Sequence, residues 1–363
     1  MKKNKTLNII LIIIAFVVGA GGMYALVNYA PKSVQTIVNK SEKEVTITDT
    51  GIADSVEKLY DAVVVVGSYK NGVLASSGTG FVYEEDDKYA YILTNSHVVD
   101  GATSVKVKFT NNNIENVELV GNDSYSDIAV LKIDKSKVLK VASIGKTTDM
   151  RVGDTVFAIG APLNDEYSWT VTRGILSGKD RLVDVSTTNS NATSDWVMSV
   201  MQTDASINSG NSGGPLANAN GEVIGITNMK LVSTGVEGIG FAIPIEDAIN
   251  YATQLRNGGK IERPFLGVSM LNSSDTYNLS RYRISVPENV EGAVVIEAQA
   301  KSPADSAGLK TGDIITKIED YDVTSVSRLK YYLYKYNPGD TVKITYVRNG
   351  KTETTSVKLE KSE

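Results

Sequence analysis

The chain has 363 residues, is 42% hydrophobic and carries a formal net charge of −5, with no basic stripe of the kind that binds nucleic acid. It contains no cysteine and one histidine, His97, which excludes disulfides, thiolate catalysis and metal sites built from cysteine or several histidines. We therefore expect no cofactor and no metal, although carboxylates alone could hold a hard cation.

The N-terminal segment predicts a membrane anchor. Lysines precede an apolar run over residues 7–27, which is long enough to cross a hydrocarbon core of about 30 Å. The lysines predict that residues 1–6 stay cytoplasmic and that everything after the run lies outside the cell. A cleaved signal peptide, with its apolar part at 7–18 and small residues at 19–22, is the alternative. The run continues past those small residues, which favours the anchor.

A polar segment over residues 28–52 contains Pro31 and reads as a linker. Beyond it, residues 53–257 hold short β-branched runs separated by turn residues, a pattern typical of antiparallel barrels or sandwiches. An apolar periodicity of helical spacing over 244–255 predicts a closing helix, and Asn257-Gly258-Gly259 predicts its end. Examples of the expected strands are 62–66, 80–83, 89–93, 105–109, 128–133, 155–159 and 223–228. A loop rich in Ser, Thr and Asn is expected over 180–196.

A second unit of mixed α/β type is expected over residues 261–360. Its predicted strands are 265–270, 292–298 and 313–318, its predicted helices are 303–308 and 325–335, and a final hairpin turns at Asn349-Gly350. The fold class is therefore mostly β, with one larger β domain followed by a smaller α/β domain.

The sharpest local signal is the stretch Gly210-Asn211-Ser212-Gly213-Gly214. A serine between glycines lies on a turn with unusual backbone dihedrals, where the amides of Gly210 and Ser212 could converge on one point as an oxyanion hole does. A plain Gly-rich hairpin turn is the other interpretation. Serine is a weak nucleophile and needs a base, and His97 supplies the only imidazole.

A catalytic histidine also needs a group that orients it. Asp127 stands at the start of an apolar strand, where an unpaired acid would be costly to bury and where pairing with His97 would remove the cost. A turn-capping role is the alternative for Asp127. The rival carboxylates Asp123, Asp134 and Asp154 have polar or glycine neighbours and are expected to be exposed.

Five motifs together resemble those of the HtrA/Deg family of serine proteases. They span 77–81 (SGTGF), 94–99 (TNSHVV), 126–131 (SDIAVL), 202–216 (QTDASINSGNSGGPL) and 238–244 (GIGFAIP), and the likeness covers nearly the whole chain after the anchor. The cysteine-free, Lys-rich chain with its N-terminal anchor is similar to Gram-positive members.

The resemblance implies a chymotrypsin-like double β-barrel followed by one PDZ domain, assembly into trimers or larger oligomers, and degradation of misfolded exported proteins. It implies the triad His97, Asp127 and Ser212, with Gly210, Asn211 and Ser212 around the oxyanion. It further implies a pocket for small or medium aliphatic side chains, for which the matching residues are Ile207, Gly238, Ile239 and Gly240.

The motif Phe265-Leu266-Gly267-Val268 resembles the carboxylate-binding loop of PDZ domains, which adds a C-terminal peptide to a sheet edge. The long polar segment 272–289 departs from the family pattern and could reshape that groove. A holdase or peptide-sensing scaffold with weak or switched proteolysis is the alternative to a working endopeptidase.

Overall fold

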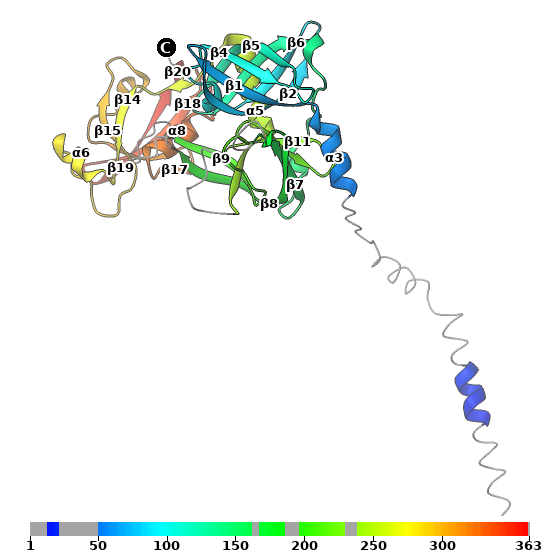
Figure 1. Cartoon of the computed structure of the whole chain (residues 1–363). Helices are drawn as coiled ribbons and strands as arrows, with labels where there is room; N and C mark the ends of the chain where they lie inside the picture. The colour runs from blue at the N-terminus through cyan, green and yellow to red at the C-terminus, as the bar shows by residue number, and fades with distance from the viewer. Residues whose placement is uncertain (1–12, 22–49, 162–166, 186–195, 229–237, 362–363) are drawn as a thin grey trace, which may run out of the picture. The chain divides into compact units, whose positions relative to one another are not determined.

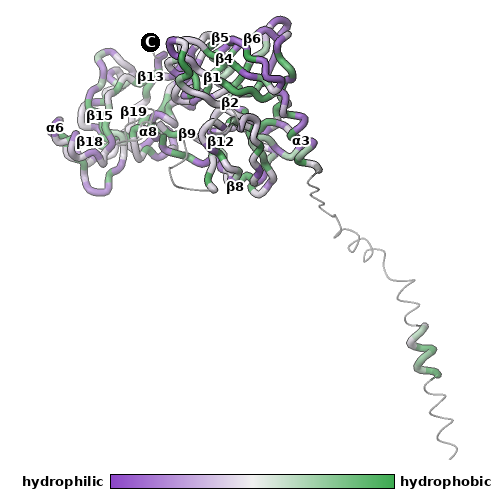
Figure 2. The backbone as a smooth tube through the Cα atoms, viewed as in Figure 1, coloured by the Kyte–Doolittle hydropathy of each residue, from purple (hydrophilic) through white to green (hydrophobic). Residues whose placement is uncertain are grey.

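The computed structural model describes residues 13–21, 50–161, 167–185, 196–228 and 238–361. Residues 13–21 form a hydrophobic helix within the unit Met1–Asp49, and a second compact unit spans Thr50–Glu363 (Figures 1 and 2). The remainder of the predicted anchor at 7–27 lies outside the described residues. None of the helices in the described ranges is both long and apolar enough to cross a membrane.

Six strands close the first barrel in the order β1-β2-β3-β6-β5-β4. Alternation of buried and exposed residues is weak along β1 and β6, whose β-branched side chains pack on both faces. The bounds are β1 Val63–Lys70, β2 Val73–Glu85, β3 Tyr89–Thr94, β4 Ser104–Lys108, β5 Ile114–Asp123 and β6 Ile128–Asp134, with helix α4 at Ser96–Val99 and short 3-10 turns at Lys135–Lys137 and Thr147–Asp149.

A second closed barrel follows in the order β10-β11-β12-β9-β8-β7. The two barrels, which Figure 1 shows one above the other, are the architecture that the family resemblance implies. The bounds are β7 Thr155–Gly160, β8 Thr170–Val185, β9 Trp196–Thr203, β10 Pro215–Asn218, β11 Val223–Thr227 and β12 Gly240–Pro244. The prediction of a loop over 180–196 is wrong for its first residues, because β8 continues to Val185. Residues 186–195 lie outside the described ranges.

Two helices flank the barrels. α5 at Ile245–Gly258 confirms the predicted closing helix and buries Ile245, Ala248, Ala252 and Leu255 against the barrels. Gly259 ends it with φ +71°, a left-handed cap that glycine adopts without strain. α3 at Thr50–Tyr60 corrects the predicted linker, since residues 50–52 already belong to a helix whose apolar face is buried through Leu59.

The C-terminal unit is a sheet in the order β14-β15-β16-β18-β19, with β17 paired to β16 and a two-stranded pair of β13 with β20. The expected strand at 265–270 is interrupted at Gly267, whose φ is +79°. Asn349-Gly350 joins β18 to β19 as predicted, with both residues at positive φ. The bounds are β13 Pro264–Phe265, β14 Val268–Asn272, α6 Thr276–Arg281, β15 Ala293–Ala298, α7 Pro303–Ser306, β16 Ile314–Ile318, β17 Tyr321–Asp322, α8 Val326–Leu333, β18 Thr341–Arg348, β19 Lys351–Lys358 and β20 Glu360–Lys361.

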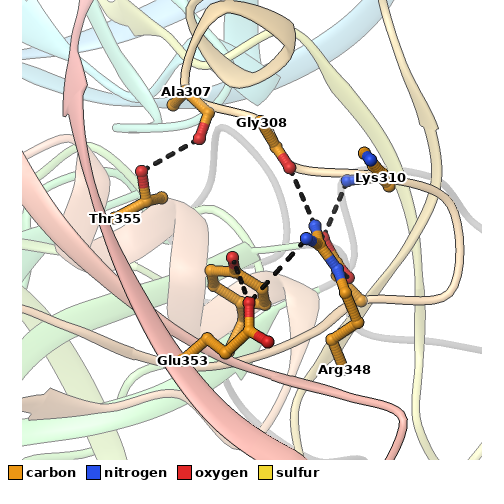
Figure 3. A network of polar contacts seen from close by, with 8 residues as sticks. Ala307, Gly308, Lys310, Arg348, Glu353 and Thr355 are labelled. Carbon is orange, nitrogen blue, oxygen red and sulfur yellow. Dashed lines mark hydrogen bonds and ion pairs between the residues drawn. The ribbon is translucent and has the colours of Figure 1, made fainter.

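An ion-pair network fastens the loop after α7 to the β18–β19 hairpin (Figure 3). The Arg348 guanidinium donates to both oxygens of the buried Asp313 carboxylate at 2.7 Å and to the Gly308 carbonyl at 2.8 Å. Thr355 adds a hydrogen bond to the Ala307 carbonyl at 2.9 Å. The hydrogen bonds to Asp313 raise the Arg348 pKa. Burial lowers it by less, so the net shift of the pKa is upward. The network satisfies a buried charge that would otherwise destabilise the sheet.

Candidate active site

Strand pairing places His97 beside Asp127. β3 and β6 are antiparallel neighbours, with Thr94 at the end of β3 opposite Ala129 near the start of β6. His97 follows β3 in α4, and Asp127 directly precedes β6. The register of one strand pair therefore brings together two residues that are 30 positions apart in the chain.

The Asp127 carboxylate binds His97 in two ways. Its Oδ2 lies 2.7 Å from His97 Nδ1, and its Oδ1 accepts the His97 backbone N–H at 3.0 Å. Asn228 Nδ2 donates to Oδ2 at 2.7 Å. The Asp127 side chain is 3% exposed and the imidazole 29%. Because an ionised carboxylate only accepts hydrogen bonds, we assign the proton to Nδ1, which leaves His97 Nε2 as an acceptor.

The backbone of Asp127 is held in an unusual conformation. Its φ is +53°, in the left-handed region that residues other than glycine seldom occupy. Its carbonyl accepts the Ser96 N–H at 3.1 Å and Asn95 Nδ2 at 2.9 Å. These bonds fix the turn, and the turn aims the carboxylate at the imidazole.

The turn that carries Ser212 lies at the junction of the two barrels. From β2 of the first barrel, the Thr79 N–H donates to the Ser212 carbonyl at 2.8 Å. From β11 of the second barrel, Thr227 accepts the Gly213 N–H at 2.9 Å and its hydroxyl donates to the Asn211 carbonyl at 2.6 Å. Ser212 is 4% exposed. Both barrels therefore fix the position of the serine.

The glycines of this turn are required by close approach. A Cβ on Gly213, whose φ is +84°, would lie 2.2 Å from the Thr79 carbonyl oxygen. A Cβ on Gly214 would lie 2.5 Å from the Ile159 carbonyl oxygen. Gly210 has a φ of +100°. The glycines let the serine turn fit between two strands of different barrels.

The backbone amide of Asn211 already has an acceptor. Its N–H donates to the Asn208 carbonyl at 3.0 Å, and its Nδ2 donates to the Ser206 carbonyl at 3.3 Å. Within the described ranges its Oδ1 is buried and has no hydrogen-bond partner. Asn211 therefore braces the turn in this conformation, and its amide is not available to an oxyanion.

The residues predicted for a substrate pocket come together in part. Ile207 is buried, and a Cβ on Gly240 would lie 2.7 Å from its Cγ1, so the two residues are in direct contact. Ile239 is exposed, and Gly238 has a φ of +75° with open space around it. Ile207 and Gly240 therefore meet, while Ile239 presents an exposed apolar side chain on the neighbouring position.

In the predicted peptide-binding loop, the Leu266 side chain belongs to the core and the backbone makes the hydrogen bonds. The Leu266 side chain is 3% exposed and packs in the core of the C-terminal unit. The carbonyls of Leu266 and Gly267 accept the N–H groups of Ala304 and Gln299 at 3.0 and 2.9 Å. Phe265 pairs with β20, and Val268 begins β14, the edge strand of the sheet. An edge strand is the element that β-augmentation requires.

Asp123 corrects the expectation that the rival carboxylates are exposed. Its two oxygens accept Arg263 at 2.6 and 2.7 Å, and its Oδ2 also accepts the Ser126 N–H at 2.7 Å. The side chains of Asp123 and Arg263 are 11% and 14% exposed. Burial alone would raise the Asp123 pKa, but the Arg263 hydrogen bonds and charge and the Ser126 bonds hold this pKa below 3.8. The pair ties the turn before Asp127 to the residue that precedes β13.

Sequence reasoning missed three residues that shape the site: Thr79, Thr227 and Asn228. Thr227 and Asn228 are both buried at the end of an apolar strand, and two adjacent buried polar side chains need partners. That signal was present in the sequence, but the partner of Asn228 lies 101 positions away. In the described part of the chain, no group of three or more His, Cys, Asp or Glu side chains could hold a metal ion.

Known protein families match both parts of the chain. The family described as "Trypsin-like peptidase domain" matches residues 78–226, and "PDZ domain" matches 264–359. The chain is 39% identical to "Serine protease Do-like HtrB" of Bacillus subtilis over 96% of this chain and 82% of the relative. It is 43% identical to "Serine protease Do-like HtrA" of Lactococcus lactis subsp. cremoris over 80% and 72%.

The chain belongs to the HtrA family of serine proteases. It is a serine endopeptidase of the kind that works in protein quality control. Solved HtrA-type structures share its fold: a Yersinia pestis serine endoprotease (TM-score 0.64, 31% identity, 88% of this chain and 100% of that one) and the protease AlgW with a decapeptide (0.65, 27%, 86% and 99%). A relative from Hahella chejuensis is named a probable periplasmic serine endoprotease.

Proposed function

We propose that His97, Asp127 and Ser212 form the catalytic triad of this HtrA protease. The observation that carries the proposal is the 2.7 Å contact between Asp127 and Nδ1 of the chain's only imidazole. The Ser212 hydroxyl attacks a peptide carbonyl while His97 Nε2 takes its proton, and His97 then protonates the leaving amine. Asp127 fixes the tautomer and stabilises the imidazolium. Water releases the acyl group by the same route in reverse.

The amides of Gly210 and Ser212 are proposed as the oxyanion donors, without the Asn211 amide. Both amides belong to the turn that Thr79 and Thr227 fix between the barrels. A fixed pair of donors stabilises charge that develops only in the transition state. Ile207, Gly238, Ile239 and Gly240 are proposed to receive a small aliphatic side chain of the substrate.

The proposed substrates are misfolded or damaged exported polypeptides. An unfolded chain exposes the aliphatic side chains and free backbone that an apolar pocket and an extended cleft can bind. The loop at Phe265, Leu266, Gly267 and Val268 is proposed to bind C-terminal peptides along the β14 edge, with the backbone of Leu266 and the following residues making the contact.

The proposed topology is a single-pass cell-membrane protein with extracellular domains. Residues 1–6 form the cytoplasmic tail, residues 7–27 the anchor, and a linker reaches helix α3. The protease domain is proposed at 53–257 and the PDZ domain at 261–360. Assembly into a homotrimer or a larger oligomer is proposed as well.

Labelling with a fluorophosphonate tests the triad. This reagent reacts with an activated serine, so mass spectrometry of the labelled peptides should place the adduct on Ser212, with and without unfolded protein present. Ser212→Ala and His97→Ala should both abolish labelling and casein cleavage. A Ser209→Ala variant changes a serine three positions away and should keep both.

The holdase alternative makes a different prediction. A protein that only binds unfolded chains would leave casein intact in the wild type, and Ser212→Ala would change nothing. Casein degradation by Ser212→Ala at the wild-type rate would remove Ser212 from the mechanism.

A further inference from the structure

A pocket of about 150 Å³ lies between α8 of the PDZ unit and the β9 and α5 segments of the second barrel. Five aromatic residues form much of its wall: Tyr125, Trp196, Tyr251, Tyr331 and Tyr334. The Tyr125 and Trp196 rings meet edge to face at 5.0 Å, and Trp196 and Tyr334 lie 5.2 Å apart. His97, Asp127 and Ser212 do not line the pocket, although Ser126, the neighbour of Asp127, does.

The aromatic rings around the pocket already attract cations of the chain itself. The Arg263 guanidinium lies 5.0 Å from the Tyr125 ring and 5.3 Å from the Tyr334 ring. The Lys335 ammonium lies 4.8 Å from the Tyr331 ring. Ring faces carry negative potential, so a cluster of this kind favours positive charge over an anion or a neutral group.

Asp247 adds a carboxylate to the same wall. Within the described residues it accepts no hydrogen bond and forms no ion pair. Burial of its carboxylate raises the Asp247 pKa, the nearby charges of Glu246 and Asp180 raise it further, and Lys335 offsets only part of this. Asp247 is nevertheless exposed at the surface of α5, so a ligand can reach the carboxylate from solvent. A cation bound here would remove an unfavourable interaction that the protein now carries.

We propose that this interdomain pocket binds a small organic cation, an alkylguanidinium or alkylammonium group. Its charged end pairs with Asp247, and its stem lies on the Trp196 and Tyr251 rings. A water molecule occupies about 30 Å³ in the liquid, so the pocket has room for a guanidinium and a few methylene groups. The group could come from a free amine or from a basic side chain of a polypeptide.

Trp196 gives a direct measurement of binding. The chain has two tryptophans, so Trp169→Phe leaves Trp196 as the only indole, inside the pocket. We would titrate this variant with agmatine, and with an N-acetylated, C-amidated Gly-Arg-Gly peptide that lacks the carboxylate a PDZ loop binds. The citrulline peptide is the neutral control of the same shape. Isothermal titration of the wild type repeats the measurement and covers a Trp169→Phe variant that fails to fold.

A saturable change in Trp196 fluorescence is expected with at least one guanidinium probe and not with the citrulline peptide. Binding of agmatine alone assigns the site to free amines, and binding of the arginine peptide alone assigns it to polypeptide side chains. Asp247→Asn should weaken binding at least about tenfold, because it removes the charge and keeps the shape. Glu57→Gln removes an exposed charge on α3 and should leave binding unchanged.

Three more variants test the aromatic wall and the competing cation separately. Tyr331→Leu should weaken binding, while Tyr331→Phe retains the ring and should preserve it. Lys335→Met removes a competing cation and should strengthen binding. Equal binding of the citrulline peptide, full binding by Asp247→Asn, or no saturable change with either guanidinium probe would overturn the proposal.

Discussion

Asp127 combines a strained backbone with a carboxylate that accepts three hydrogen bonds. The strain is tolerable because Ser96 and Asn95 hold the carbonyl of the same residue. Strained residues that their surroundings hold firmly are typical of active sites. The Asp127 carboxylate contacts the imidazole. Ser96, Asn95 and Asn228 instead bond to Asp127 and hold it in position.

Substitutions at Asp127 and Asn228 should therefore differ in size. Asp127→Asn keeps the shape but gives His97 the wrong partner, and kcat should fall by about 10⁴-fold. Asn228→Ala removes one hydrogen bond to the carboxylate and should lower kcat/KM by about 10- to 100-fold, in line with the strength of charged hydrogen bonds. Steady-state kinetics on a peptide substrate measures both. Equal losses from the two variants would contradict this division of roles.

Substitution of Gly213 should destabilise the fold much more than substitution of Gly72, although both glycines have a positive φ. Gly213→Ala combines a positive φ with an overlap against the Thr79 carbonyl, and we expect a loss of about 3 kcal/mol or more in unfolding free energy. Gly72 has a similar φ of +82° but open space around it, so Gly72→Ala should cost only about 1 kcal/mol. Urea unfolding of the two variants compares them directly.

Much of the site could be predicted from the sequence at the level of single residues. His97 supplies the only imidazole in the sequence, and Ser212 is singled out by its glycine neighbours together with the five motifs that resemble the HtrA/Deg family. The supporting contacts could not be predicted in this way. Thr79 meets Gly210 across 131 positions and Asn228 meets Asp127 across 101, and such pairings depend on how two barrels pack.

At the scale of elements, the β3–β6 pair and the turn before β6 build the site. Strands with unbroken apolar runs, such as β6 and β7, were predicted within one residue of their observed ends. β8 was missed because Gly174, Gly178 and Lys179 interrupt its alternation. α3 was missed because its residues 50–52 read as the end of a polar linker. Asp123 looked exposed because its partner Arg263 comes 140 positions later.

Breaking the Asp123–Arg263 pair should destabilise the fold. Arg263→Met leaves the mostly buried Asp123 carboxylate without its cationic partner, and we expect a loss of about 3–5 kcal/mol in unfolding free energy at neutral pH. The pair of Lys137 with Glu115 is more exposed, so Lys137→Met should cost less than about 1 kcal/mol. Chemical unfolding followed by far-UV circular dichroism compares the two.

The difference in unfolding free energy between wild type and Arg263→Met should become smaller as the pH falls. The Asp123 pKa is lowered in the folded protein, so the stabilisation is present above its usual value of 3.8 and is lost as the pH falls through the lower folded pKa. The gap between wild type and Arg263→Met should therefore narrow in acid below pH 3.8. A gap of constant size across that range would show that the carboxylate charge is not the cause.

At the scale of the whole molecule, two barrels share one serine turn and the PDZ unit packs on the second barrel through α8 and β9. The sequence predicts two domains in this order, because the chain is long enough for two and Asn257-Gly258-Gly259 marks the end of a helix between them. It could not predict the interface, where Trp196 and Tyr334 meet from opposite sides of that boundary.

Removing residues 1–27 should test the proposed anchor. The full chain should stay with membranes through a carbonate wash, because an apolar helix is held by hydrocarbon and not by charge. The shortened chain should be soluble and should keep its casein activity, since the residues of the proposed triad lie in the unit Thr50–Glu363. A mature protein whose mass lacks the N-terminal segment would instead indicate signal-peptide cleavage.

The solitary imidazole has a spectroscopic consequence. Its Nδ1 lies 2.7 Å from a carboxylate that is almost fully shielded from solvent, so we expect the proton between them to exchange slowly with water and to resonate far downfield. In most proteases that signal must be picked out among other histidines. Here nitrogen-15 histidine labelling would mark a single ring, so one spectrum would follow its ionisation and tautomer as substrate arrives, without assigning any other residue.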